Sequence, residues 1–273
     1  MGTIIRVANL LKVGNPASST FQKELYLSYM PIPGKYIADF EEGEIYHIYN
    51  RTNNKEKLFL TDENRLFFLK RYKEIIAPFA DTYCWNLLPN HFHFLIKIKS
   101  EQLIIAYLQS KLKGSLIITE SKFLASRVAN LSKVGNPDTS KSPKVGNPES
   151  PITFSELIEQ TFKRFFQSYA LAFNKQHHRH GNLFYKPFKR VKIENDAQFS
   201  MALIYIHANA AKHGLVKDFT SYTWSSWHSI ISNQPTLLLR DEVIKWFGSL
   251  EVCIKSHKEL AASYYNCEMA IED

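Results

Sequence analysis

The spacing of hydrophobic and polar residues divides much of the chain into strand-like and helix-like segments. Residues 43–51, GEIYHIYNR, mix β-branched and aromatic residues and are typical of a strand. Residues 61–79 place apolar side chains three and four positions apart, which predicts a helix with its N-cap at Thr61 or Asp62. The change of period therefore indicates a strand followed by a helix.

The next two apolar runs are joined too closely to be parallel strands. Residues 81–88 and 91–98 are both strand-like, and Pro89-Asn90 alone connects them. A parallel pair needs a crossover of about a dozen residues or more, so the sequence predicts an antiparallel hairpin. Helical spacing then recurs over about 101–123, 154–176 and 197–213, the last ended by Gly214, while 182–193 is partly extended.

One short sequence occurs twice, and its ending occurs a third time. RVANLLKVGNP at 6–16 matches RVANLSKVGNP at 127–137, and KVGNP returns at 144–148. A stacked repeat protein needs contiguous units of about 20–50 residues, whereas these copies are short, scattered and end in a turn signal. We interpret residues 125–150, rich in Ser, Asn, Pro, Gly and Lys, as a flexible surface insertion. If the copies are translated pieces of a repeated DNA element, deleting 125–150 leaves the activity of the protein largely intact.

The predicted elements and the insertion together give an expected organisation. It comprises a poorly ordered leader at 1–41, a main domain at 42–230 that contains the insertion 125–150, and a tail of one or two helices at 231–273.

Charge and composition narrow the class of protein. The 273 residues include 34 Lys and Arg against 26 Asp and Glu, a formal net charge of +8, which favours nucleic acid as a partner. A hydrophobic share of 45% argues against a disordered chain, and the lack of any run near 18 apolar residues argues against a membrane-spanning helix. Three distant cysteines, Cys84, Cys253 and Cys267, argue against a disulfide scaffold and a cysteine-rich zinc site, and they suit a reducing cytoplasm.

Two histidines alternate with two aromatic residues in the strand 91–98. The period of two puts His91 and His93 on one face and Phe92 and Phe94 on the other, towards the core. Two imidazoles side by side on a strand form half of a divalent-metal site, which then needs a third ligand from elsewhere. The alternative is a structural histidine pair.

The helix 197–213 carries a second candidate pair. Tyr205 and Asn209 are four residues apart, so they project from the same face one turn apart. Tyr205 is a candidate nucleophile, although a free phenol has a pKa of about 10, and the Asn209 carbonyl is a candidate ligand for a hard cation. The alternative for Tyr205 is core packing. His207 lies two residues further along the helix and points elsewhere, which favours packing or DNA contact.

Taken together and in order, these motifs resemble a known family. The chain resembles the REP-associated and insertion-sequence single-tyrosine transposases of the HUH (His–hydrophobic–His) superfamily over about 42–230. The motifs that carry the resemblance are HIYNRTNN (47–54), PNHFHFLIKI (89–98), FKRVKI (188–193), YIHANAAKHGLVKDF (205–219) and YTWSSW (222–227).

The resemblance implies a fold, a reaction and a set of residues. The implied fold is α+β, a ferredoxin-like two-layer sandwich whose antiparallel sheet carries helices on one face. His91, His93 and Asn209 would bind one Mg²⁺ or Mn²⁺, and Tyr205 would be the nucleophile. The implied enzyme is a transposase that cleaves and rejoins single-stranded DNA through a 5′-phosphotyrosine intermediate at hairpin-flanked element ends. The expected partner is single-stranded or hairpin DNA and not a membrane. We expect a bacterial, cytoplasmic, nucleoid-associated monomer or homodimer.

Residues 163–192, which precede the helix that carries Tyr205, form a basic stretch that contains no acidic residue. Cations that follow phosphates and interleaved aromatic rings that stack on bases are typical of a single-strand site, although the rings at helical spacing, Phe165, Phe166, Tyr169 and Phe173, are expected to pack in the core. The run His177-His178-Arg179-His180 is interpreted as a solvated basic loop, with a second metal site as the alternative. The predicted DNA-binding residues are Lys163, Arg164, Lys175, Arg179, Lys186, Lys189, Arg190 and Lys192.

Two other functions are compatible with parts of this pattern. A catalytically decayed nucleic-acid-binding descendant of such a transposase would keep the basic surface and lose the reaction. A replication initiator or relaxase of the same superfamily fits less well, because these often carry two nucleophilic tyrosines or a helicase module, and Tyr205 is the only tyrosine on its helix.

Overall fold

The computed structural model describes residues 36–111 and 152–265. The strands and helices predicted within these ranges are present, with ends within a few residues of those expected. In chain order the elements are β1 (Ile45–Arg51), η1 (Asn53–Lys55), α3 (Asp62–Ile75), β2 (Ala80–Leu87), β3 (His91–Ile98), α4 (Glu101–Lys111), α6 (Phe154–Gln176), β4 (Lys189–Lys192), α7 (Asp196–Lys212), η2 (Phe219–Ser221), α8 (Trp227–Ile231), α9 (Arg240–Phe247) and α10 (Leu250–Tyr265).

The four strands form one antiparallel sheet in the order β2-β3-β1-β4. The chain runs through β1, α3, β2, β3, α6 and β4, which is the strand–helix–strand–strand–helix–strand order of a ferredoxin-like fold. The hairpin predicted around Pro89-Asn90 joins β2 to β3. The α+β class and the antiparallel sheet are therefore confirmed.

Local signals in the sequence account for where the helices begin and end. Thr61, rather than Asp62, is the N-cap of α3: its hydroxyl accepts from the Asn64 N–H, and the Asn64 side chain accepts from the Thr61 N–H. Thr153 caps α6 in the same way. Gly214 follows α7 with a φ of +68°, a conformation that favours glycine after a helix end.

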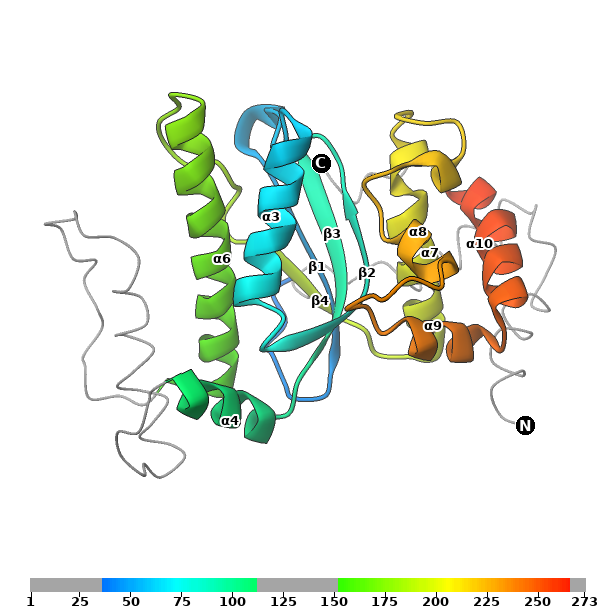
Figure 1. The fold of residues 1–273 in the computed structure, drawn as a ribbon, viewed down its shortest axis with the longest axis horizontal. Coiled ribbons are helices and arrows are strands. Elements are labelled where there is room, and N and C mark those ends of the chain that lie inside the picture. The colour runs from blue at the N-terminus through cyan, green and yellow to red at the C-terminus, as the bar shows by residue number, and fades with distance from the viewer. Residues whose placement is uncertain (1–35, 112–151, 266–273) are drawn as a thin grey trace, which may run out of the picture.

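One face of the sheet packs against α3 and α6 through a core rich in aromatic rings (Figure 1). Tyr72 of α3 stacks on Phe94 of β3 with ring centroids 4.2 Å apart, and Phe68 contacts Phe165 of α6. The aromatic residues of the basic stretch that were expected to pack in the core are buried there. They are Phe165, Phe166, Tyr169 and Phe173.

The opposite face of the sheet is also covered by helices, an addition to the single helical layer that was expected. Figure 1 shows α7, α8, α9 and α10 on the side of the sheet away from α3 and α6. The reason lies in β3, where Phe94 faces the first core and Leu95 a second core built on α7. Because β3 is buried on both faces, it needs cover on both. Most of α7 is correspondingly buried, from Phe199 to Ala210.

Residues on either side of the expected domain 42–230 also pack against it. Phe40 lies in the first core, and the Ala38 N–H donates to the Arg190 carbonyl at 3.2 Å. Cys253 of α10 is buried in the second core. The insertion 125–150 and most of the leader lie outside the described residues. Within the described ranges, no helix has both the length and the apolar character needed to cross a bilayer.

Candidate functional site

The strand β3 places His91 and His93 on the face that α7 covers. Their ring centroids are 5.2 Å apart, and the rings are nearly perpendicular. His93 is fully buried and His91 is 8% exposed. The Asn90 side-chain oxygen lies 2.7 Å from His91 Nδ1, and this contact orients the His91 ring. The predicted pair therefore shares one face, as the period of two requires.

His93 has a different neighbour at each ring nitrogen. Its Nδ1 shares a hydrogen bond of 2.9 Å with Nε2 of His47, a residue of the neighbouring strand β1. Its Nε2 lies 3.1 Å from Nδ2 of Asn209 on α7. The Tyr49 ring stacks on the His93 ring at a centroid separation of 5.6 Å. These contacts fix the orientation of the His93 imidazole, which is a candidate metal ligand from the sequence.

The helix α7 brings Tyr205 and Asn209 to this point. Asn195 caps the helix by accepting from the Gln198 N–H at 2.9 Å, and the Asn86 side chain of β2 donates to the Ile206 carbonyl at 2.7 Å. The second bond ties the middle of the helix to the sheet. The Tyr205 ring meets the His93 ring edge-on at 5.8 Å between centroids. The structure thus brings together two residue pairs that are more than a hundred positions apart in sequence.

The donor atoms at this point suit a small divalent cation. Ligands around Mg²⁺ lie about 2.1 Å from the ion, so neighbouring donor atoms are about 3 Å apart. His93 Nε2 and the Asn209 amide already have that separation, and a half-turn of the amide presents its oxygen instead of its nitrogen. Among the described residues, no group of three or more His, Cys, Asp and Glu side chains is placed to bind a metal. The fit therefore depends on the amide of Asn209 as third ligand.

On the other side of α7, His207 is part of a buried polar cluster. Its Nδ1 lies 3.1 Å from Nε2 of His257 on α10, and its Nε2 lies 2.8 Å from the Ser226 hydroxyl. Burial lowers the pKa of His207 well below its usual value, and burial lowers the pKa of His257 to about 4. His207 therefore packs α7 against α10 and lies away from the strand that carries His91 and His93.

The predicted DNA-binding residues do not form one surface. Lys163, Arg164 and Lys175 lie on α6, across the sheet from His91. Arg190 is buried: its Nε donates to the Ala38 carbonyl at 2.6 Å and its Nη2 to Glu159 at 3.0 Å. Arg190 thus makes its hydrogen bonds inside the protein, and its guanidinium is not exposed to a DNA strand. Lys192, Lys189 and Lys186 follow at or beside the sheet edge, where Lys192 pairs with Glu41 and Glu44, Lys189 lies over the Tyr36 ring, and Lys186 is exposed.

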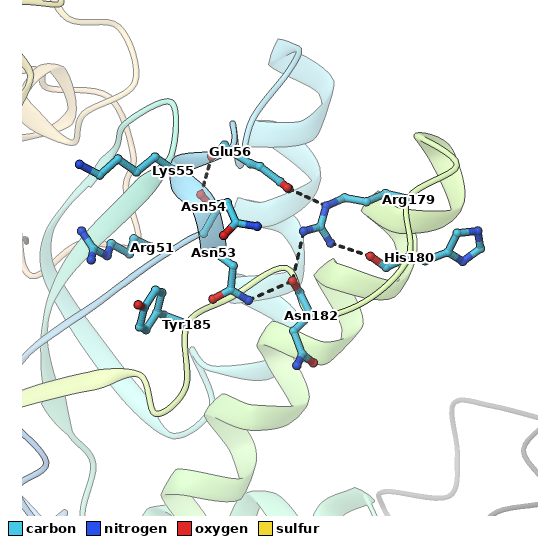
Figure 2. Close-up of a pocket in the computed structure, with 10 residues that line it drawn as sticks. Arg51, Asn53, Asn54, Lys55, Glu56, Arg179, His180, Asn182 and Tyr185 are labelled. Carbon is cyan, nitrogen blue, oxygen red and sulfur yellow. Dashed lines mark hydrogen bonds and ion pairs between the residues drawn. The ribbon is translucent and has the colours of Figure 1, made fainter.

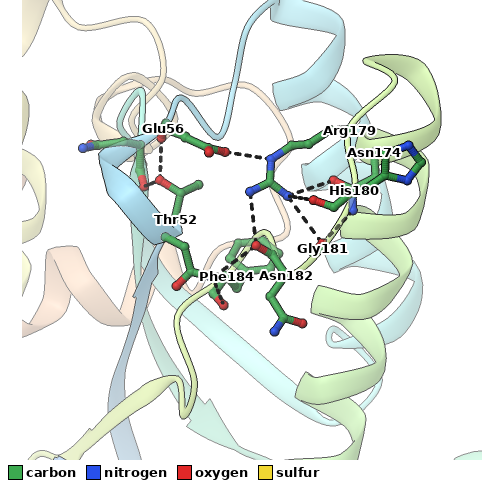
Figure 3. Close-up of polar contacts among 10 residues, drawn as sticks. Thr52, Glu56, Asn174, Arg179, His180, Gly181, Asn182 and Phe184 are labelled. Atoms are coloured by element: carbon green, nitrogen blue, oxygen red, sulfur yellow. Dashed lines mark hydrogen bonds and ion pairs between the residues drawn. The ribbon is translucent and has the colours of Figure 1, made fainter.

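Arg179 braces the loop that was interpreted as a solvated basic segment. Its Nε pairs with Glu56 at 2.7 Å, across the gap between the loop and the turn that follows β1 (Figure 2). The same guanidinium donates to the Asn174 side chain at the end of α6 and to three carbonyls of the loop, those of His180, Gly181 and Asn182 (Figure 3). The side chains of His178 and His180 are exposed. Arg179 is therefore occupied in holding the loop, and the alternative of a second metal site finds no suitable group among the described residues.

Three residues at the site were missed as candidates from the sequence. They are His47, Tyr49 and Asn86, which contact His93 or the α7 backbone. The signal for two of them is present in HIYNR, where alternate positions put His47 and Tyr49 on the same face of β1. What sequence spacing could not supply is the β1–β3 register, which pairs Tyr49 with His93 and Arg51 with His91.

No protein-family model matches the chain, and no curated protein matches it. Among solved structures, the chain is similar to a REP-associated tyrosine transposase bound to a REP hairpin. The match has 15% sequence identity and a TM-score of 0.43, and it covers 76% of this chain and 89% of that chain. At this identity the likeness concerns the fold alone and assigns no role to any residue.

Proposed function

We propose that the protein is a metal-dependent single-tyrosine transposase that cleaves and rejoins single-stranded DNA at hairpin-flanked element ends. One observation supports this more than any other. His93 of β3 and Asn209 of α7 approach to 3.1 Å, with Tyr205 one helical turn away and its ring against His93. A nucleophile beside a set of metal donors is the arrangement that phosphodiester transfer needs.

The reaction follows from the chemistry of these groups. The Tyr205 oxygen attacks phosphorus, the bond from phosphorus to the 3′ oxygen breaks, and a 5′-phosphotyrosine and a 3′-hydroxyl result. The proton lost by the phenol is balanced by the proton gained by the departing 3′ oxygen. A 3′-hydroxyl from another end then attacks the phosphotyrosine and releases Tyr205. Because the ester keeps the bond energy, rejoining needs no ATP.

His91, His93 and Asn209 would bind the metal ion in this scheme. When bound, Mg²⁺ or Mn²⁺ would polarise the phosphate and neutralise the charge that develops on it. His93 would coordinate through Nε2, which leaves the proton on Nδ1 to be donated to His47. His47 would thereby set both the tautomer and the direction of the His93 lone pair.

Burial of the nucleophile adds a condition to the scheme. The Tyr205 side chain is fully buried, and the Lys212 ammonium lies 5.1 Å from the centre of its ring. A DNA strand therefore reaches the Tyr205 hydroxyl only after the residues that pack around α7 move apart.

The proposal is tested by strand cleavage. A hairpin DNA with an unpaired flank, labelled at its 5′ end, is incubated with the full chain and Mn²⁺, and the products are separated on a denaturing gel. We expect a shortened product that is absent with EDTA and with His91→Ala. A catalytically decayed, DNA-binding descendant would bind the same hairpin and give no product in any condition.

A further inference from the structure

A polar pocket opens at the end of β1, next to the strand that carries His91. Its volume is about 660 Å³, within the range of about 300–1,000 Å³ that is usual for small-ligand sites. Its walls are the turn after β1 and the loop between α6 and β4, and Figure 2 shows residues of both walls around it. Arg51 of the pocket pairs in register with His91, so the pocket lies beside the candidate metal ligands.

Hydrogen bonds between the two walls hold the pocket in shape. The Glu56–Arg179 ion pair bridges them, and the Asn53 side chain donates across the gap to the Asn182 carbonyl at 3.1 Å. The Tyr185 N–H also donates to the Arg51 carbonyl at 2.9 Å. A pocket whose walls are linked in this way needs little reorganisation to accept a ligand.

The charge of the lining favours an anion. Arg51, Lys55 and Arg179 are cationic, and among the described residues that line the pocket Glu56 is the one carboxylate, already paired with Arg179. Arg51 and Lys55 are the cations at the end of the pocket nearer β1. Figure 2 shows both side chains extending to the same side, away from Arg179 and His180.

An exposed aromatic ring lies at the same end. Tyr185 is 48% exposed, whereas its neighbour Phe184 is buried in the core. The Arg51 guanidinium lies 5.1 Å from the centre of the Tyr185 ring, a cation–π contact. The Asn50 side chain donates to the Tyr185 carbonyl at 3.1 Å, so the backbone that presents the ring is fixed. A flat ring next to two cations matches the two parts of a nucleotide, its base and its phosphate.

From this pocket we infer that the chain binds an unpaired nucleotide that flanks the scissile phosphate. The base stacks on Tyr185, and the phosphate lies between Arg51 and Lys55. This inference rests on the proposed function for the position of the nucleotide relative to the reaction, while the binding itself needs only the pocket.

The test separates binding from chemistry. Fluorescently labelled oligothymidine of twelve nucleotides is titrated with the full chain in EDTA, and anisotropy gives the Kd. Stacking of one base contributes about 1–3 kcal/mol, so Tyr185→Ala is expected to weaken binding by about tenfold, and Tyr185→Phe, which keeps the ring, restores it. Arg51→Ala is expected to weaken binding to a similar extent and to reduce the dependence of binding on salt.

One matched control variant and one competitor make the result decisive. Lys70→Ala removes an exposed charge from α3, on the other face of the sheet, and is expected to leave the Kd unchanged. Equal binding by wild type, Tyr185→Ala and Arg51→Ala would overturn the inference. Competition by inorganic phosphate at the concentrations at which the oligonucleotide binds would also overturn it, in favour of a site for small anions. Binding lost in the pocket variants of a chain that cleaves no DNA would support the pocket and contradict the proposed function alone.

Discussion

His47 and His93 share a hydrogen bond of 2.9 Å between Nε2 of the first and Nδ1 of the second, across the pair of strands β1 and β3. The other nitrogen of His93 faces Asn209 at 3.1 Å. One imidazole therefore connects the central strands of the sheet to the helix that carries Tyr205. The two predictions on Mn²⁺ binding that follow depend on the orientation of the His93 ring.

His47→Ala is expected to weaken Mn²⁺ binding by about 10- to 100-fold, because the hydrogen bond that orients His93 is lost while every ligand remains. Isothermal titration calorimetry with Mn²⁺ and no DNA measures this directly. His228→Ala, which removes an exposed histidine on α8, serves as the control and should bind Mn²⁺ as wild type does. Unchanged Mn²⁺ affinity in His47→Ala would mean that His93 does not depend on His47.

Asn209 gives a second test of the ligand set. Asn209→Ala removes the amide that lies against His93, and we expect at least a tenfold loss of Mn²⁺ affinity. Asn209→Asp keeps an oxygen at the same place and adds a negative charge, so its Mn²⁺ affinity is expected to equal or exceed that of wild type. The ligand role is contradicted if the two variants bind Mn²⁺ equally well.

Arg190 distinguishes a structural cation from a DNA-binding one. Its guanidinium is buried and donates to the Ala38 carbonyl and to Glu159, so Arg190→Ala removes both hydrogen bonds, while the half-buried Glu159 keeps Lys163 as a partner. We expect the free energy of unfolding in urea to fall by about 2 kcal/mol. Lys175→Ala, on the exposed surface of α6, should leave that free energy unchanged. Equal stability of the two variants would contradict the structural role of Arg190.

The buried histidines behind α7 predict a loss of stability in acid. Burial lowers the pKa of His257 from 6.5 to about 4, so the unfolded chain binds this proton more tightly than the folded chain. Stability is then full above about pH 6.5 and falls as the pH drops towards 4, by about 2 to 3 kcal/mol at pH 4.5 for this group. Urea unfolding at several pH values measures the effect. His257→Gln should lose less stability over this range than wild type, and an equal loss would exclude His257 as a cause.

The local elements could be predicted from the sequence because each rests on nearby signals. The Thr61 cap, the short link at Pro89-Asn90 and Gly214 set the ends of elements through contacts within a few residues. The shared face of His91 and His93 follows from strand geometry, and that of Tyr205 and Asn209 follows from helix geometry.

Pairings between distant segments could not be predicted in the same way. The contact of His93 with His47 depends on the β1–β3 register, and the second helical layer depends on burial of β3 on both faces. The basic stretch misled for a related reason. The sequence shows that a residue is charged or aromatic but does not show whether its side chain faces the core or the solvent. Arg190 is buried, whereas Tyr185, which lies in sequence among aromatic residues of the core, is exposed.

Tyr205 is expected to become covalently joined to DNA through its phenolic oxygen. The full chain is incubated with a hairpin DNA that carries an unpaired flank and with Mn²⁺, digested with protease and nuclease, and analysed by mass spectrometry. We expect a nucleotide attached through phosphate to the peptide that contains Tyr205, and no such adduct in Tyr205→Phe or in EDTA. An adduct on another residue, or cleavage of the DNA by Tyr205→Phe at the rate of wild type, would contradict this expectation.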